Sequence, residues 1–152
     1  MSGIFNFAHL DLPFPDLREK FIRSLEDEGA ETFLEALFFL LKVKAMIDPD
    51  FRRNLTDFPA RYQFKSRGNG LAVLLEFADG GVHFREELRD DVNVTVIFKD
   101  GRSLISFLLS QKKDIFRSLL NNEVRVMGNL NYIYKLGFMA NHLQLEFTGN
   151  LP

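Results

Sequence analysis

Residues 92–101 read VNVTVIFKDG and carry the clearest alternation in the chain. Apolar side chains occupy every second position: Val92, Val94, Val96 and Phe98. This period of two is typical of a strand with one buried face, and Asp100-Gly101 then ends it. The same period extends upstream to Ala60 in three further segments. Because short turns join the four predicted strands, we expect an antiparallel meander.

Two glycine-rich turns separate these upstream segments. Gly68-Asn69-Gly70 precedes a strand at residues 71–77, and Asp79-Gly80-Gly81 precedes one from Val82 to about Glu87. A phosphate-binding loop would need its glycines to open a helix, whereas strands follow here, so hairpin turns are favoured.

The segments on either side of the predicted strands have helical periodicity instead. Upstream, we expect a helix over about 17–28, a second from about Glu31 to Asp48-Pro49, and a short one within 50–57. The second carries a broad apolar stripe: Phe33, Leu34, Leu37, Phe38, Leu41 and Ala45. Downstream, we expect helices capped by Ser103 and Asp114, a fifth strand at 124–127, and a last helix from about Leu130 to His142.

Composition narrows the class of protein. A chain of 152 residues suits one domain, and the absence of cysteine excludes thiol nucleophiles and thiolate metal sites. The net charge of −2 gives no attraction to nucleic acid. The longest apolar run, residues 33–41, is too short to span a membrane, and the start has no basic signal-peptide region, so we expect a cytoplasmic protein.

His83, Glu86 and Glu87 are candidates for a metal site or for acid–base catalysis. On a strand, however, His83 and Glu86 fall on opposite faces, which favours solvated side chains. No catalytic motif is present, so we predict no enzyme, catalytic residue, metal or cofactor. Four basic residues form a cluster that is either an ordinary solvated face or a site of weak, transient contact with anionic membrane head groups: Lys112, Lys113, Arg117 and Arg125.

The last helix is apolar almost all the way round, which requires burial on two sides. Its second neighbour is either another helix or a bound apolar ligand. A surplus of 17 phenylalanines over three tyrosines and no tryptophan fits a lining that needs few hydroxyl partners.

Three segments together resemble the sterol carrier protein, or nonspecific lipid-transfer, family: VNVTVIF at 92–98, NEVRVMGN at 122–129, and Lys135-Leu136 in the last helix. The resemblance covers residues 57–147. It implies an α/β fold of the α+β type, with a five-stranded, mainly antiparallel sheet covered on one face by helices that enclose an apolar tunnel. It also implies lipid binding without catalysis. The linker 110–113 departs from the family because it lacks a glycine.

The resemblance implies these tunnel-lining residues: Phe98, Leu104, Phe107, Leu108, Phe116, Leu119, Met127, Ile133, Leu136 and Met139.

We therefore expect a sterol-carrier-like lipid-binding domain at 57–152, with an arm and two helices at 1–56 packed on the same domain. The predicted function is binding and transfer or presentation of a fatty acyl, sterol or isoprenoid quinone lipid. The alternative is an accessory protein that binds a partner enzyme of lipid or quinone biosynthesis through residues 31–45. Exposure of the stripe around Phe33, Leu37 and Phe38 would favour that alternative.

Overall fold

The computed structural model describes residues 29–109, 117, 119 and 121–148. Its helices are α2 (Ala30–Ile47), α3 (Pro49–Thr56), α4 (Gly101–Leu109) and α6 (Leu130–Thr148). Its strands are β1 (Ala60–Ser66), β2 (Ala72–Ala78), β3 (Gly81–Glu86), β4 (Val94–Phe98) and β5 (Val124–Gly128), and a 3-10 turn at Arg67–Asn69 links β1 to β2. The helix predicted at 17–28 lies outside the described residues, and of the helix predicted from Asp114 only Arg117 and Leu119 are described, both as helical.

The strands form one mixed sheet in the order β3-β2-β1-β4-β5. The hairpins β1-β2 and β2-β3 are antiparallel, as the turn signals predicted. The predicted four-stranded meander is wrong at its last step, because β4 pairs in parallel with β1 and not with β3. β5 then pairs antiparallel with β4, so the sheet is mainly antiparallel with one parallel pair.

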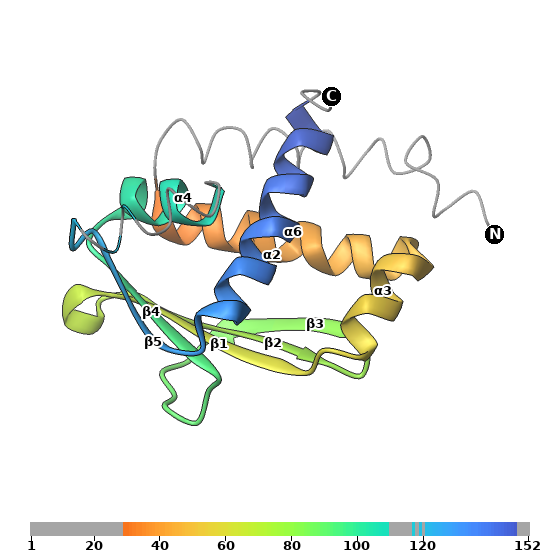
Figure 1. The fold of residues 1–152 in the computed structure, drawn as a ribbon, viewed down its shortest axis with the longest axis horizontal. Helices are drawn as coiled ribbons and strands as arrows, with labels where there is room; N and C mark the ends of the chain where they lie inside the picture. The colour runs from red at the N-terminus through yellow and green to blue at the C-terminus, as the bar shows by residue number, and fades with distance from the viewer. Residues whose placement is uncertain (1–28, 110–116, 118, 120, 149–152) are drawn as a thin grey trace.

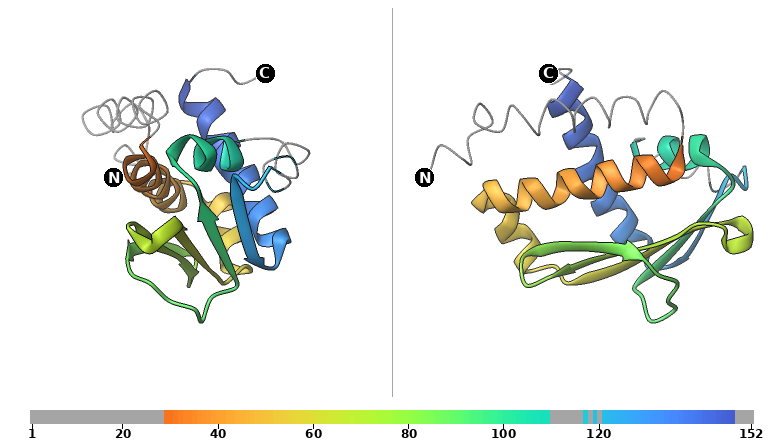
Figure 2. Two further views of the ribbon diagram at one scale, coloured as in Figure 1. Left: turned by 90° about the vertical axis from the view of Figure 1, so that its left-hand side faces the viewer. Right: turned by 180° about the vertical axis from the view of Figure 1, so that it is seen from behind.

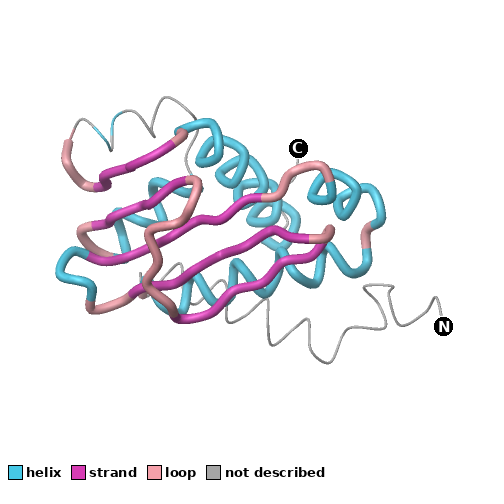
Figure 3. Tube along the Cα trace, turned by 90° about the horizontal axis from the view of Figure 1, so that it is seen from below, coloured by secondary structure: helices cyan, strands magenta, loops and turns pink. Residues whose placement is uncertain are grey.

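The described helices cover a single face of this sheet (Figures 1 and 2). Figure 3, seen from below, shows the strands in front and the helices behind them. Alternation explains the layering: Val94, Val96 and Phe98 are buried against the helices, whereas Thr95 and Ile97 point to the other face and are half-buried. The apolar core therefore lies between one face of the sheet and the helical layer.

At the starts of α3, α4 and α6, a side chain accepts a backbone hydrogen bond. The predicted Ser103 cap is wrong by three residues, because the Ser103 N–H donates to Asp100 Oδ1 at 2.8 Å and the helix begins at Gly101. Asn129 Oδ1 likewise accepts from the Asn131 N–H at 2.9 Å and starts α6.

A strap at residues 87–93 crosses the face of the sheet opposite the helices and carries the chain from β3 to β4 (Figure 3). Gln63 on β1 is fully buried beneath it. The Gln63 amide donates to the Glu87 carbonyl at 3.0 Å and accepts from the Arg89 N–H at 2.6 Å. This link between β1 and the strap explains how β4 comes to lie beside β1.

Replacing Gln63 by alanine should lower the free energy of unfolding by about 2–3 kcal/mol, because strap backbone groups lose their partners. Urea unfolding measures the change, and Lys65→Ala, a half-buried position on the same face of β1, is the matched control. Equal losses in the two variants would contradict a clamping role for Gln63.

Candidate functional site

The interior between the sheet and the helices brings together most of the predicted lining residues. They share one buried apolar cluster, with at most 7% of any side chain exposed: Phe98, Leu104, Phe107, Leu108, Ile133, Leu136 and Met139. Leu119 is half-buried against the same cluster. Phe116 lies outside the described residues.

Met127 does not join this interior. Its side chain is 56% exposed, because β5 alternates and Met127 shares the outer face with Arg125 while Val124 is buried. Met127 also pairs with Thr95, on the face of β4 that points away from the helices. The prediction that Met127 lines the interior is therefore corrected by the strand register.

The interior also contains side chains that the sequence did not single out as lining. Tyr62 on β1 is fully buried, its hydroxyl donates to the Tyr132 carbonyl at 2.8 Å, and burial raises the pKa of that hydroxyl. The Tyr62 and Phe64 rings stack with centroids 6.2 Å apart. The sequence feature that could have identified them as interior residues is the alternation of Tyr62 and Phe64 along β1.

The apolar stripe of α2 contributes to the same cluster. Phe33, Leu37, Phe38 and Leu41 are each 0% exposed. Phe38 lies against Phe64 of the sheet, with ring centroids 5.5 Å apart. The stripe is thus part of the core and offers no exposed apolar patch for a partner.

A cleft of about 370 Å³ opens where α3 and α6 meet the end of α2, and we call it the α3–α6 cleft. Its lining mixes charged, polar and apolar side chains: Lys44, Asp48, Asp50, Phe51, Asn54, Lys135, Phe138, Met139, His142 and Leu143. Met139 and Leu143 are buried members of the core cluster. The floor of the cleft is therefore the surface of the apolar interior.

Two lysines give the α3–α6 cleft its cationic groups. Lys44 Nζ lies 3.3 Å from Asp48 Oδ2. Burial raises the pKa of Asp48, but the Phe51 N–H and the Lys44 ammonium outweigh it, so that the pKa stays below its ordinary value. Lys135 Nζ lies 4.0 Å from the centroid of the Phe58 ring, and within the described chain no carboxylate pairs with it.

Phe138 stands at the rim of this cleft and is 76% exposed, with its ring stacked on His142 at 6.5 Å. The sequence pattern predicted that α6 is buried on two sides, and Phe138, which belongs to the second of these sides, is exposed instead. An exposed aromatic beside an opening to an apolar interior provides a surface on which an apolar ligand can first rest.

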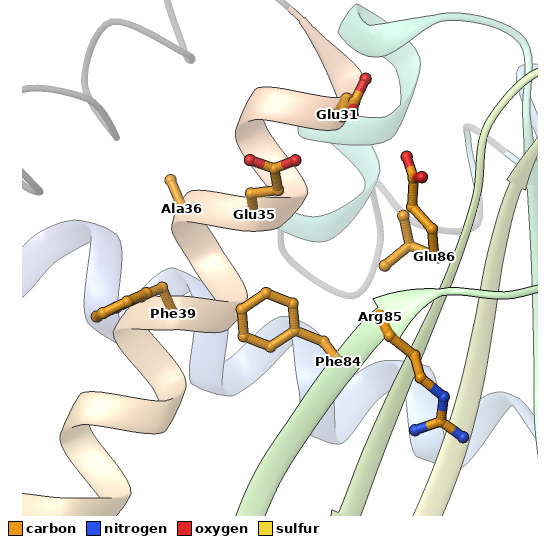
Figure 4. Close-up of a pocket in the computed structure, with 8 residues that line it drawn as sticks. Glu31, Glu35, Ala36, Phe39, Phe84, Arg85 and Glu86 are labelled. Atoms are coloured by element: carbon orange, nitrogen blue, oxygen red, sulfur yellow. The ribbon is translucent and has the colours of Figure 1, made fainter.

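A second hollow, of about 260 Å³, lies between α2 and the edge strand β3, and we call it the α2–β3 groove (Figure 4). Its lining residues are Glu31, Glu35, Ala36, Phe39, Val73, Phe84, Arg85 and Glu86. Among the predicted lining residues, only Met139 borders either hollow; the other described ones are packed in the interior or, as with Met127, lie on the outer face.

Metal-ligating side chains are dispersed in the described part of the chain, where no three of His, Asp and Glu gather to hold an ion. His83 is exposed and lies opposite Glu76, while Glu86 points to the other face of the sheet. None of the helices in the described ranges is long and apolar enough to cross a membrane.

Comparison of the sequence with known families and with curated proteins returns no match. Comparison of the structure does. The fold resembles a protein described as UbiJ-SCP2 Ubiquinone synthesis protein, with a TM-score of 0.55 and 18% identity over 70% of this chain and 86% of that one. It also resembles sterol carrier protein domain 2 of Helicoverpa armigera, with a TM-score of 0.50 and 16% identity over 82% of this chain and 94% of that one.

A third similar structure is the inverting sec-alkylsulfatase Pisa1 from Pseudomonas sp., with a TM-score of 0.52 and 15% identity. There the match covers 68% of this chain but 16% of the sulfatase. At these identities the likeness is one of fold. The chain has a fold like that of these sterol-carrier-type structures, as the resemblance of its three sequence segments implied.

Proposed function

We propose that this protein binds a lipid without catalysis, with the hydrocarbon part in the apolar interior and the polar head at the α3–α6 cleft. Fatty acyl, sterol and isoprenoid quinone lipids are the candidate classes. The protein then carries the lipid or presents it to an enzyme.

The observation that supports this most directly is the continuity of cleft and core at Met139 and Leu143. A lipid hydrocarbon chain that enters past these side chains leaves water and contacts an apolar lining, which stabilises binding by about 25 cal/mol per Å² of buried apolar surface. Methionine is unbranched and adapts to different shapes, so Met139 suits a site that opens to admit a ligand.

The cleft chemistry suits an amphipathic ligand more than a pure hydrocarbon. Lys135 contacts the face of the Phe58 ring, and its ammonium group can still bind a lipid carboxylate or a polar quinone ring. The two sterol-carrier-like neighbours also support lipid as the ligand class. One of these neighbours is named as a ubiquinone synthesis protein, which is a reason to include quinones among the ligands tested.

The test is native mass spectrometry of delipidated protein with a panel of palmitate, cholesterol and ubiquinone. We expect one complex of defined stoichiometry with at least one of these lipids, retained after gel filtration. Failure to take up any of the three would overturn the proposal.

Delivery to a partner enzyme remains compatible with lipid binding, but the apolar stripe of α2 does not supply the partner surface. The α2 stripe is buried, so residues 31–45 offer a partner their exposed side chains, such as Glu31, Glu35 and Phe39, and not the stripe.

A further inference from the structure

The α2–β3 groove has the geometry of a peptide-binding site, in which a helix lies beside an edge strand. β3 is at the end of the sheet, and within the described residues no strand pairs with its outer side. Glu31, Glu35 and Phe39 are spaced four residues apart on α2 and are all exposed. They therefore form one row along the groove.

The backbone of β3 offers unpaired groups along this groove. Ala78 and Gly81 close a two-residue turn, so they form a hydrogen-bonded pair, and such pairs alternate along an antiparallel ladder. The backbone N–H and C=O groups of His83 and Arg85 therefore form hydrogen bonds with β2. The N–H and C=O groups of Val82, Phe84 and Glu86 point to the free edge.

Two ends of the groove differ in chemistry. At one end Glu86 on β3 stands beside the helix turn that carries Glu31 and Glu35, and at the other Phe84 lies near Phe39 (Figure 4). Arg85 points away from the groove in this view and pairs with Glu87. No ion pair to the three groove carboxylates occurs within the described part of the chain.

We infer that the α2–β3 groove binds an extended segment of a partner protein that carries a Lys or Arg two residues from a large apolar side chain. The segment adds a strand to β3, and alternate side chains then point toward α2. The basic side chain meets Glu31, Glu35 and Glu86, and the apolar one packs on Phe39 and Phe84.

The dimensions fit such a segment. Eight residue steps of helix, from Glu31 to Phe39, rise about 12 Å. Four residue steps of strand, from Val82 to Glu86, extend about 13 Å. A partner strand of about five residues therefore spans both walls.

Charge distinguishes this occupant from two others. A second copy of the chain pairing edge to edge would present the inward side chains of its own β3, Val82, Phe84 and Glu86, which include no Lys or Arg to pair with the three carboxylates. An anionic lipid would meet the same three carboxylates, whereas the α3–α6 cleft presents Lys44 and Lys135 instead. A cationic extended segment is the occupant that the groove attracts.

The probe is the capped peptide Thr-Arg-Thr-Leu-Thr-Arg-Thr, whose symmetric Arg-x-Leu-x-Arg order suits either strand direction. In NMR titrations of the full chain, we expect saturable shifts at the amides of Val82, Phe84 and Glu86 and slower hydrogen exchange there. The peptide Thr-Thr-Arg-Leu-Arg-Thr-Thr has the same composition, but its Arg and Leu side chains fall on opposite faces. It should bind at least about tenfold more weakly.

Backbone pairing is tested by changing the peptide, so the protein itself stays unchanged. N-methylation of the Arg and Leu amides and N-methylation of the Thr amides block opposite edges of the added strand. One set should abolish binding and the other should not. Equal effects of the two sets would show that no strand is added and would overturn the inference.

The charge contribution is tested with Glu31→Gln, Glu35→Gln and Glu86→Gln combined, which should weaken peptide binding about tenfold. A matched triple variant makes the same charge change at exposed sites away from the groove: Asp57→Asn, Asp79→Asn and Asp90→Asn. It should stay within about twofold of the parent. Equal losses in both, shifts confined to other surfaces, or self-association in light scattering without peptide binding would each refute the proposed occupant.

Discussion

Replacing Gly128 by alanine is expected to lower the free energy of unfolding by about 3 kcal/mol or more. Gly128 has φ +115°, and an added Cβ would lie 2.3 Å from the Asn93 carbonyl oxygen and 2.9 Å from Val94 Cα. Both neighbours are backbone atoms, so no side chain can rotate aside. The variant must strain its own backbone and displace the start of β4.

Two hydrogen bonds hold Asn93 in place, which raises the free-energy cost of displacing it. Its side-chain oxygen accepts from the Arg61 N–H at 2.8 Å, and its own N–H donates to the Arg61 carbonyl at 3.0 Å. Gly68→Ala is the matched control, since Gly68 also has a positive φ of 83° but nothing lies within 4 Å of an added Cβ. Chemical unfolding should show a clearly larger loss at Gly128, and equal losses would disprove the close approach.

This contact gives a physical reason for one of the three segments that carry the family resemblance. Gly128 permits β5 to pass close to the start of β4, and Asn129 then caps α6. The sequence alone predicts that Gly128 breaks the strand. It does not contain the distance to Asn93, because the two residues are far apart in the chain and meet through the antiparallel pairing of β4 with β5.

Local periodicity predicted the strands well, and the turns predicted the two hairpins, but neither predicted that β4 pairs with β1. Val94, Val96 and Phe98 identify β4 and its buried face, and the structure agrees. The partner of β4 is fixed by the strap, whose clamp joins Gln63 to Glu87 and Arg89. Nothing in the alternation of residues 92–98 encodes a contact made from a different strand.

Met127 shows the opposite situation, in which local periodicity was the better guide. Val124 and Val126 alternate with Arg125 and Met127, so the strand pattern alone places Met127 on the outer face with a charged neighbour. Position-by-position transfer from the family placed it inside. The α3–α6 cleft was not predictable from either source, since Lys44, Phe51 and Lys135 come together only when three helices pack.

Replacing Met139 by glutamate should reduce lipid uptake by about tenfold or more, because the carboxylate would lie where the α3–α6 cleft meets the apolar interior. Met46→Glu is the matched control: it introduces the same charge in place of the same residue, but at a position on α2 that is 58% exposed and outside the cleft. We expect the control to keep uptake within about twofold of the parent. Uptake is read from the fraction of lipid-bound protein in native mass spectra.

Since Met139 is 7% exposed, the glutamate also affects stability, and two further variants separate folding from binding. Met139→Leu conserves volume and apolarity and should retain uptake. Phe138→Glu changes a rim side chain that is 76% exposed, so the fold is preserved while an anionic ligand meets a repelling charge at the opening. If both folded glutamate variants take up lipid as well as Met46→Glu does, the ligand does not enter through the α3–α6 cleft. Loss of lipid uptake in both glutamate variants, with unchanged circular dichroism, would show that the lipid enters through the α3–α6 cleft.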